Sequence, residues 1–193
     1  YIFHPEEVPY NRHYREYIRS HPKGYAMLLK NVTIRYAKLN PERPDKKMVK
    51  EGRWSLQMIT RDRNQAKEWK DAQIKTKMDE DDNGVFWVAN IGKKAVKADG
   101  SPAAPVEVVN GNKVAIDPTS IGNDSVCNIK IYQRPYVNKE TGANMIHNML
   151  TGVQVKVHKV YVPRVYEEFE DEGETTTFMP EGSTTDDDDD IAF

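Results

Sequence analysis

The distribution of charge divides this chain into two parts that cannot fold in the same way. Of its 30 acidic residues, 12 lie between Glu167 and Phe193, a stretch that contains no Lys, Arg or His. Residues 1–166 therefore carry 28 basic and 18 acidic residues, and the net charge of −2 is the sum of about +10 and −12. A segment with high charge and little apolar content cannot bury enough surface to fold. We therefore expect residues 167–193 to form a disordered acidic tail, and the fold to be built from the basic part.

The basic part is long enough for one domain with a hydrophobic core. Cys127 is the only cysteine, which excludes a disulfide framework and a cysteine-based zinc site and suits a reducing cytosol. No apolar run approaches the roughly 18 residues that a membrane span needs, and no signal peptide is apparent. The sequence therefore predicts a cytoplasmic protein without a membrane partner.

Short strands separated by turn residues dominate the basic part, and one helix interrupts them. Residues 1–24, broken by prolines, are predicted to be an N-terminal arm, and residues 25–166 the folded domain. The helix is expected at residues 64–78, with Asn64 as its N-cap, and an acidic loop follows at residues 79–84. A hairpin is expected around Asn110-Gly111, with residues 106–109 and 113–116 as its arms. The remaining strands are expected at residues 25–39, 53–61, 85–91, 126–132 and 151–162.

This inventory predicts a mainly β (α+β) protein. Several short strands with one inserted helix pack most simply as a small Greek-key barrel.

Alternation within one predicted strand suggests a ligand. Ile129 and Ile131 point to one side of the strand, whereas Lys130, Tyr132 and Arg134 point to the other. A cation, an aromatic ring and a second cation on one face suit the stacking of a base and the neutralisation of its phosphates. Such stacking contributes about 1–3 kcal/mol per base and tolerates any sequence.

Other strands repeat this arrangement. In the last strand Val153, Val155 and Val157 are expected to point inward, and the polar side chains between them outward. Tyrosine and tryptophan in strands also pack in cores or at edges, while Lys and Arg keep the outer face in solvent. For each single residue, this packing role stays open as an alternative to DNA binding. The basic excess and the acidic tail favour nucleic acid for the set as a whole. The candidate DNA-binding residues are Arg35, Tyr36, Arg53, Trp54, Lys130, Tyr132, Arg134, Tyr136, Lys156 and His158.

Nothing in the sequence argues for catalysis, a metal or a cofactor. Asp79, Asp81, Asn83 and Gly84 match the opening of a calcium-binding EF-hand loop, but Asn90 stands where a bidentate glutamate is required. The acidic run is more simply a solvated turn. The five histidines show no metal-ligand spacing, and no phosphate loop or nucleophile motif occurs. We therefore predict a protein that is not an enzyme.

The C-terminal residues 186–193 (DDDDDIAF) resemble the tip of bacterial single-stranded-DNA-binding proteins. The basic part is similar instead to the single-stranded-DNA-binding proteins of short-tailed lytic bacteriophages. That resemblance rests on Ile121-Gly122, residues 128–136 (NIKIYQRPY), Gly142-Ala143 and residues 153–161 (VQVKVHKVY). Residues 52–61, followed by a helix, resemble an earlier strand-then-helix step of the same family.

The resemblance implies an OB-type Greek-key barrel and sequence-nonspecific binding of single-stranded DNA in phage replication, recombination and repair. It also implies homodimerisation, and a location in the cytoplasm of the infected bacterial host. Tyr132, Arg134 and Tyr136 carry over to the binding strand, and Phe193 to the tip. The tail is expected to contact replication proteins (DNA polymerase, helicase or primase) and to occupy the DNA groove when DNA is absent. The tail residues assigned to these contacts are Asp186, Asp187, Asp188, Asp189, Asp190, Ile191 and Phe193.

Other functional classes remain open from the sequence. A nucleic-acid chaperone or histone-like protein would share the basic excess but prefer duplex. A metal-dependent nuclease would use Asp81, and a purely structural phage protein would leave the tip unexplained.

Overall fold

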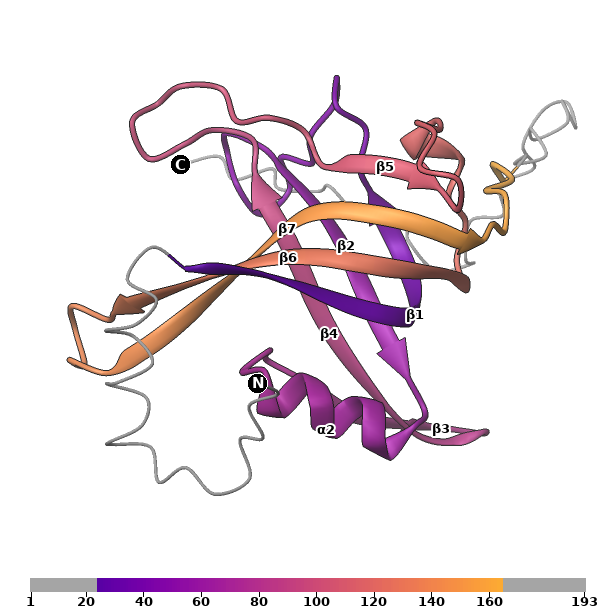
Figure 1. Cartoon of the computed structure of the whole chain (residues 1–193), viewed down its shortest axis with the longest axis horizontal. Helices are drawn as coiled ribbons and strands as arrows, with labels where there is room; N and C mark the ends of the chain where they lie inside the picture. The colour runs from indigo at the N-terminus through magenta and orange to yellow at the C-terminus, as the bar shows by residue number, and fades with distance from the viewer. Residues whose placement is uncertain (1–23, 165–193) are drawn as a thin grey trace, which may run out of the picture. The chain divides into compact units, whose positions relative to one another are not determined.

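Seven strands and one α-helix account for most of the regular structure of residues 24–164, the part of the chain that the computed structural model describes (Figure 1). The predicted tail and almost all of the predicted arm lie outside this range. In chain order the elements are β1 (Tyr25–Lys38), β2 (Arg53–Thr60), α2 (Arg63–Asp71), β3 (Lys77–Asp81), β4 (Gly84–Lys94), β5 (Glu107–Asn110), the 3-10 turn η2 (Pro118–Ser120), β6 (Ser125–Val137) and β7 (Asn144–Val157).

The strands form one sheet that closes on itself. Their order is β3-β4-β2-β1-β6-β7-β5, and a further parallel pairing joins β4 to β7 at Gly92 and Met149. This pairing closes β1, β2, β4, β7 and β6 into a five-stranded barrel, while β3 and β5 extend it at its edges. A five-stranded Greek-key barrel of this kind is the OB fold. The predicted fold class, mainly β with an OB-type barrel and one inserted helix, is confirmed.

Alternation along the strands builds the barrel core. Ile129 and Ile131 of β6 are completely buried, and Leu56 and Met58 of β2 pack with them. The helix α2, inserted between β2 and β3, contributes Trp69 to the same core. Each buried aliphatic or aromatic side chain contributes about 1.5–3 kcal/mol, so the core accounts for much of the stability of the barrel.

The helix is shorter than the sequence predicted, and its N-cap is a different residue. It ends at Asp71 rather than near residue 78, because Gln73 adopts a left-handed φ of 57° and the chain then turns into β3. Asp62 is the N-cap, and its carboxylate accepts a hydrogen bond of 2.9 Å from the Asn64 backbone N–H. Asn64, the predicted cap, lies inside the helix.

Three predictions about the strands and the loops between them are wrong in detail. The predicted acidic loop at residues 79–84 is a β-hairpin, in which Asp82 and Asn83 connect β3 to β4. The Asn110-Gly111 turn forms, but residues 113–116 make only an isolated bridge, and β5 pairs in parallel with β7 instead. At the end of β7, Val157 is 51% exposed rather than inward-facing.

The β6–β7 hairpin is longer than predicted and extends past the barrel at the left of Figure 1. Its arms pair continuously from Ile131 and Leu150 to Val137 and Asn144. The loop closes with a hydrogen bond of 2.8 Å from the Asn138 N–H to the Ala143 carbonyl. No helix among the described residues is long and apolar enough to cross a membrane.

The corrected N-cap is open to a stability test. Asp62→Ala removes the acceptor of the Asn64 N–H and is expected to cost about 0.5–2 kcal/mol in the free energy of unfolding. Asn64→Ala is the matched control and should cost less, since its side chain caps nothing. Urea denaturation of both variants measures the difference. An Asn64→Ala cost equal to or above that of Asp62→Ala would contradict the assignment.

Candidate nucleic-acid interface

The outer surface of β2 and β4 is polar because their inner surface forms the core. Trp54, Leu56 and Met58 point inward, so the residues between them in β2 point outward. In the antiparallel pairing of β2 with β4, Arg53 lies opposite Lys94, Ser55 opposite Gly92, and Gln57 opposite Asn90. Arg35 of β1 pairs with Gln57 on the other side. Strands β1, β2 and β4 thus present one continuous polar outer face.

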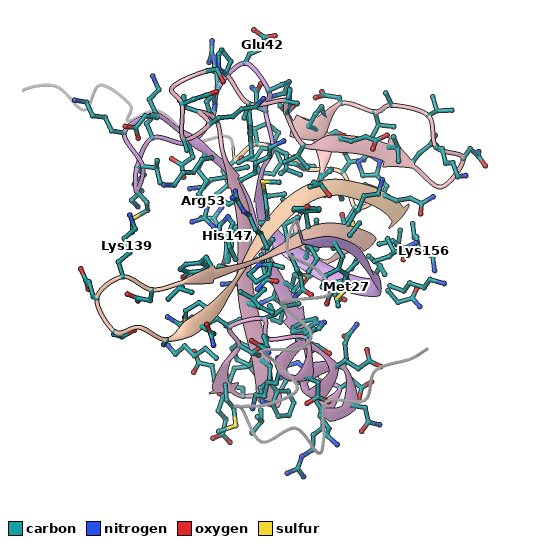
Figure 2. The ribbon with its side chains drawn as sticks, turned by 60° about the vertical axis from the view of Figure 1, so that its left-hand side comes forward. Met27, Glu42, Arg53, Lys139, His147 and Lys156 are labelled. Atoms are coloured by element: carbon teal, nitrogen blue, oxygen red, sulfur yellow. The ribbon has the colours of Figure 1, made fainter. Side chains whose placement is uncertain are left out.

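Barrel closure adds residues of β6 and β7 to this face. Gly92 of β4 lies beside Met149 of β7, and two residues earlier in β7 His147 pairs with Arg134 of β6. The side chain of Arg53 lies directly over Gly92, the β4 residue that pairs with β7. Figure 2 shows Arg53 and His147 together on the side of the molecule that carries Lys139, away from Lys156.

Arg53, Lys94, Arg134 and His147 form what we call the cationic cluster. Arg53, Lys94 and Arg134 lie close enough to His147 to lower its pKa by charge repulsion, although partial desolvation of this exposed ring contributes most to that shift. No ion pair within residues 24–164 includes a member of the cluster. Elsewhere, ion pairs join Arg35 to Asp124, Lys38 to Asp45, Arg61 to Asp81 and Lys130 to Glu107. The cluster is therefore a concentration of positive charge that nearby described carboxylates do not neutralise.

Aromatic rings lie beside the cluster and along the face. Tyr132 is two residues from Arg134 on the outer side of β6 and pairs with Met149. Tyr136, 45% exposed, follows in the protruding hairpin. Phe86 lies on the same side of β4 as Asn90. The Arg61 guanidinium carbon lies over the Phe86 ring, 5.2 Å from its centroid. Tyr136 is the most exposed of the three, because Tyr132 lies close to Gly24 and Arg61 covers one face of Phe86.

Tyr36 has an unusual backbone conformation. Its φ of 52° is left-handed, which is rare for a bulky side chain, and its ring is 62% exposed. The pairing of β1 with β2 shifts register between Arg35 and Lys38, so Tyr36 lies in an irregularity of the strand. Its N–H donates to the Asn123 side chain at 2.9 Å, which holds this conformation.

The structure brings some predicted residues together and separates others. Arg53, Tyr132 and Arg134 meet at the barrel closure, with Arg35 farther along the same face and Tyr136 in the hairpin. The other predicted cations have partners elsewhere: Lys130 pairs with Glu107 at 3.8 Å, Lys156 donates to the Asn31 side chain, and the His158 ring lies 3.1 Å from the Ser120 hydroxyl.

Trp54 is a core residue, so its prediction as a DNA-binding residue is not supported by its position. It is 3% exposed, and its indole N–H donates to the Asn40 carbonyl at 2.8 Å. A base could stack on this ring only if the barrel opened. The sequence contained the signal for burial, since Trp54, Leu56 and Met58 are spaced two residues apart and therefore share one apolar face of the strand.

Sequence reasoning missed half of the cluster. Lys94 continues the alternation of β4 beyond the apolar run at residues 85–91, and this signal was available. His147 lies outside the predicted strand, because β7 begins at Asn144 and not at residue 151. No sequence signal marks Gly92 as the position that Arg53 crosses.

The acidic run does not assemble a metal site in the described structure. Asp81 is paired with Arg61, its carboxylate 2.6 Å from the guanidinium, and this contact lowers the pKa of Asp81 and raises that of Arg61. No group of three or more His, Cys, Asp or Glu side chains within residues 24–164 could hold a metal ion. The predicted partner-binding residues, Asp186 to Asp190 with Ile191 and Phe193, lie outside the described residues.

The structure is similar to those of two phage proteins. One is gp2.5, a single-stranded DNA binding protein encoded by bacteriophage T7, with 13% identity, 80% of this chain and 100% of that chain covered, and a TM-score of 0.46. Another is the single-stranded DNA-binding protein from bacteriophage Enc34, with 15% identity, 76% and 87% covered, and a TM-score of 0.46. A structure of the Enc34 protein in complex with ssDNA matches with 15% identity, 69% and 87% covered, and a TM-score of 0.44. No protein-family model and no curated protein matches the sequence.

The position of Gly92 is open to a direct test. A β-carbon there would overlap Arg53 Nε and lie 2.6 Å from the Trp54 carbonyl oxygen, so Gly92→Ala must shift both. We expect a loss of about 1–3 kcal/mol in the free energy of unfolding. Gly111→Ala is the control, because a β-carbon at Gly111 meets nothing within 4 Å. Equal unfolding free energies for the two variants would refute the close packing of Arg53 on Gly92.

Proposed function

We propose that this chain is a sequence-nonspecific single-stranded-DNA-binding protein of a phage. The observation that carries the proposal is the cationic cluster, Arg53, Lys94, Arg134 and His147, on the outer face of an OB-type barrel. The charges of Arg53, Lys94 and Arg134 have no carboxylate partner within residues 24–164. Unpaired cations that converge on one surface attract a polyanion, because binding releases the counterions that the nucleic acid had condensed.

The aromatic rings favour a single strand over a duplex. Bases stacked inside a duplex have no free face, whereas an unpaired base can stack on Tyr132 beside the cluster or on Tyr136 beyond it. Stacking on a ring and contact with phosphates read no sequence, which supports nonspecific binding. Arg53 of β2 and Lys94 of β4 agree with this, because OB folds bind oligonucleotides on the corresponding strands.

Duplex binding in the manner of a histone-like protein is the second candidate, and the positive charge alone would support it equally. A competition between single- and double-stranded oligonucleotides of equal length separates the two. Preference for the duplex would overturn the proposal.

The wider role that we propose follows from the resemblance of residues 186–193 and of the barrel strands to their families. The protein would act in phage replication, recombination and repair, in the cytoplasm of the infected host, as a homodimer. We further propose that residues 1–24 are an arm and residues 167–193 a tail. Ile191 and Phe193 would engage replication proteins, and Asp186 to Asp190 would compete with DNA for the cationic cluster.

Polymer dimensions allow this competition. A flexible tail of 27 residues has an end-to-end distance of roughly 5–6 Å × √27, or about 30 Å. The radius of gyration expected for the domain is about 15 Å. A tail of that length would reach the cationic cluster of its own domain or of a partner at high effective concentration.

A substitution in the cluster tests the proposed interface. Arg134→Ala should weaken binding to single strands of every sequence and reduce the slope of log affinity against log salt by about 0.7, the value for one lost phosphate contact. Lys156→Ala is the control, because Lys156 is also an exposed cation but lies away from the cluster. Fluorescence titrations at several salt concentrations measure both.

Equal losses in the two variants would indicate diffuse charge attraction rather than a defined interface. Unchanged binding in Arg134→Ala would remove Arg134 from the site.

Removal of the tail tests the competition. A chain that ends before Asp186 should bind single strands more tightly at low salt, because five carboxylates no longer compete for the cluster. The gain should disappear as salt rises and screens the attraction. A chain in which Asp186 to Asp190 are replaced by Asn controls for tail length and should behave like the truncated form. Equal or weaker binding without the tail would refute the competition.

A further inference from the structure

His147 differs from the other members of the cationic cluster because its charge depends on pH. It lies opposite Arg134 in the β6–β7 pairing, and Arg53 of β2, which lies over Gly92, is near enough to act on its charge (Figure 2). An imidazole can gain or lose a proton between about pH 5 and 8, whereas a guanidinium keeps its charge throughout. The cluster therefore contains three fixed cations and one conditional one.

The surroundings of His147 in the free protein favour the neutral ring. His147 is exposed at the surface, but the protein atoms around its ring remove part of its hydration and lower its pKa, and repulsion from Arg53, Lys94 and Arg134 lowers it further. These three groups, from β2, β4 and β6, are the described charges that act on His147. No described carboxylate forms an ion pair or a hydrogen bond with the His147 ring. While the cluster is unoccupied, these surroundings therefore favour the uncharged ring at neutral pH.

A phosphate at the cluster reverses this balance. An anion between Arg53, Lys94 and Arg134 offsets the repulsion that the three cations exert on His147, and it can accept a hydrogen bond from the protonated ring. Both effects raise the pKa of His147. The protonated ring then adds a positive charge at the place where the ligand is negative.

From this geometry we propose that His147 is a proton-linked phosphate contact: it is neutral while the cationic cluster is unoccupied and takes up a proton when DNA phosphate occupies the cluster. The inference rests on the proposed function and adds a property to the same site. Nothing in the sequence pointed to His147 as a binding residue.

The direction of the effect follows from linkage. The bound state holds the proton more tightly than the free state, so single-strand affinity rises as pH falls through the interval between the two pKa values. One proton limits the gain to about tenfold per pH unit. At a pH above the pKa of the bound state, His147 is neutral in both states, and its protonation no longer changes the affinity.

The experiment is a binding titration with a thymidine oligonucleotide from about pH 5.5 to 8, the range in which an imidazole titrates. The full chain is compared with three variants at constant salt. His147→Gln keeps a polar side chain without the proton, and His147→Lys carries a permanent charge. His158→Gln is the matched control, because His158 is the other histidine among residues 24–164 and lies beside Ser120, away from the cluster.

The proposal expects the full chain and His158→Gln to gain affinity as pH falls. His147→Gln should lose that gain, and His147→Lys should bind at neutral pH as tightly as the full chain does at the acidic end. As an independent readout, NMR titration of the His147 ring should show its pKa rise when the oligonucleotide is added.

Two results would overturn the inference while leaving the proposed function intact: a pH-dependent gain that persists in His147→Gln, or a ring pKa that is unchanged by DNA. Absence of single-strand binding at every pH would instead overturn the proposed function, and this inference with it.

Discussion

The parallel contact between β4 and β7 at Gly92 and Met149 is the constraint on which the rest of the structure depends. Without it the sheet would remain open, and β2 and β4 would lie at one end of the strand order, far from β6 and β7. With it, a β2 arginine and a β6 arginine approach the same histidine. The close approach requires a residue without a side chain at position 92, because the Trp54 carbonyl and the Arg53 guanidinium occupy that space.

Charge balance gives this contact its functional meaning. Several cations around the barrel have a carboxylate within ion-pair distance, including Arg35, Lys38 and Arg61. Such exposed pairs add little stability, but they cancel local charge. The cations at the closure have no such partner among the described residues, so their positive charge is not cancelled locally.

Alternation predicted the core well and the interface only in part. Ile129, Ile131 and Val153 face inward as the sequence indicated, because a strand with one buried face has a period of two. The same rule would have identified Trp54 as a core residue. The boundaries of α2 and β7 were wrong because caps and pairing partners set them, and a capping hydrogen bond or a long hairpin outweighs local propensity. His147 was missed for this reason, since the start of β7 depends on its pairing with β6.

The sequence by itself determined the class of fold, the division into a basic part and an acidic end, and which side of β6 carries Tyr132 and Arg134. These properties depend on composition and on periodicity along a single strand. Only the tertiary structure decided that Arg53, Lys94, Arg134 and His147 share one surface, and that Lys130, Lys156 and His158 lie elsewhere. Barrel closure sets these neighbours, and closure depends on pairing between strands that are far apart in the chain. No local pattern of residues encodes such a distance.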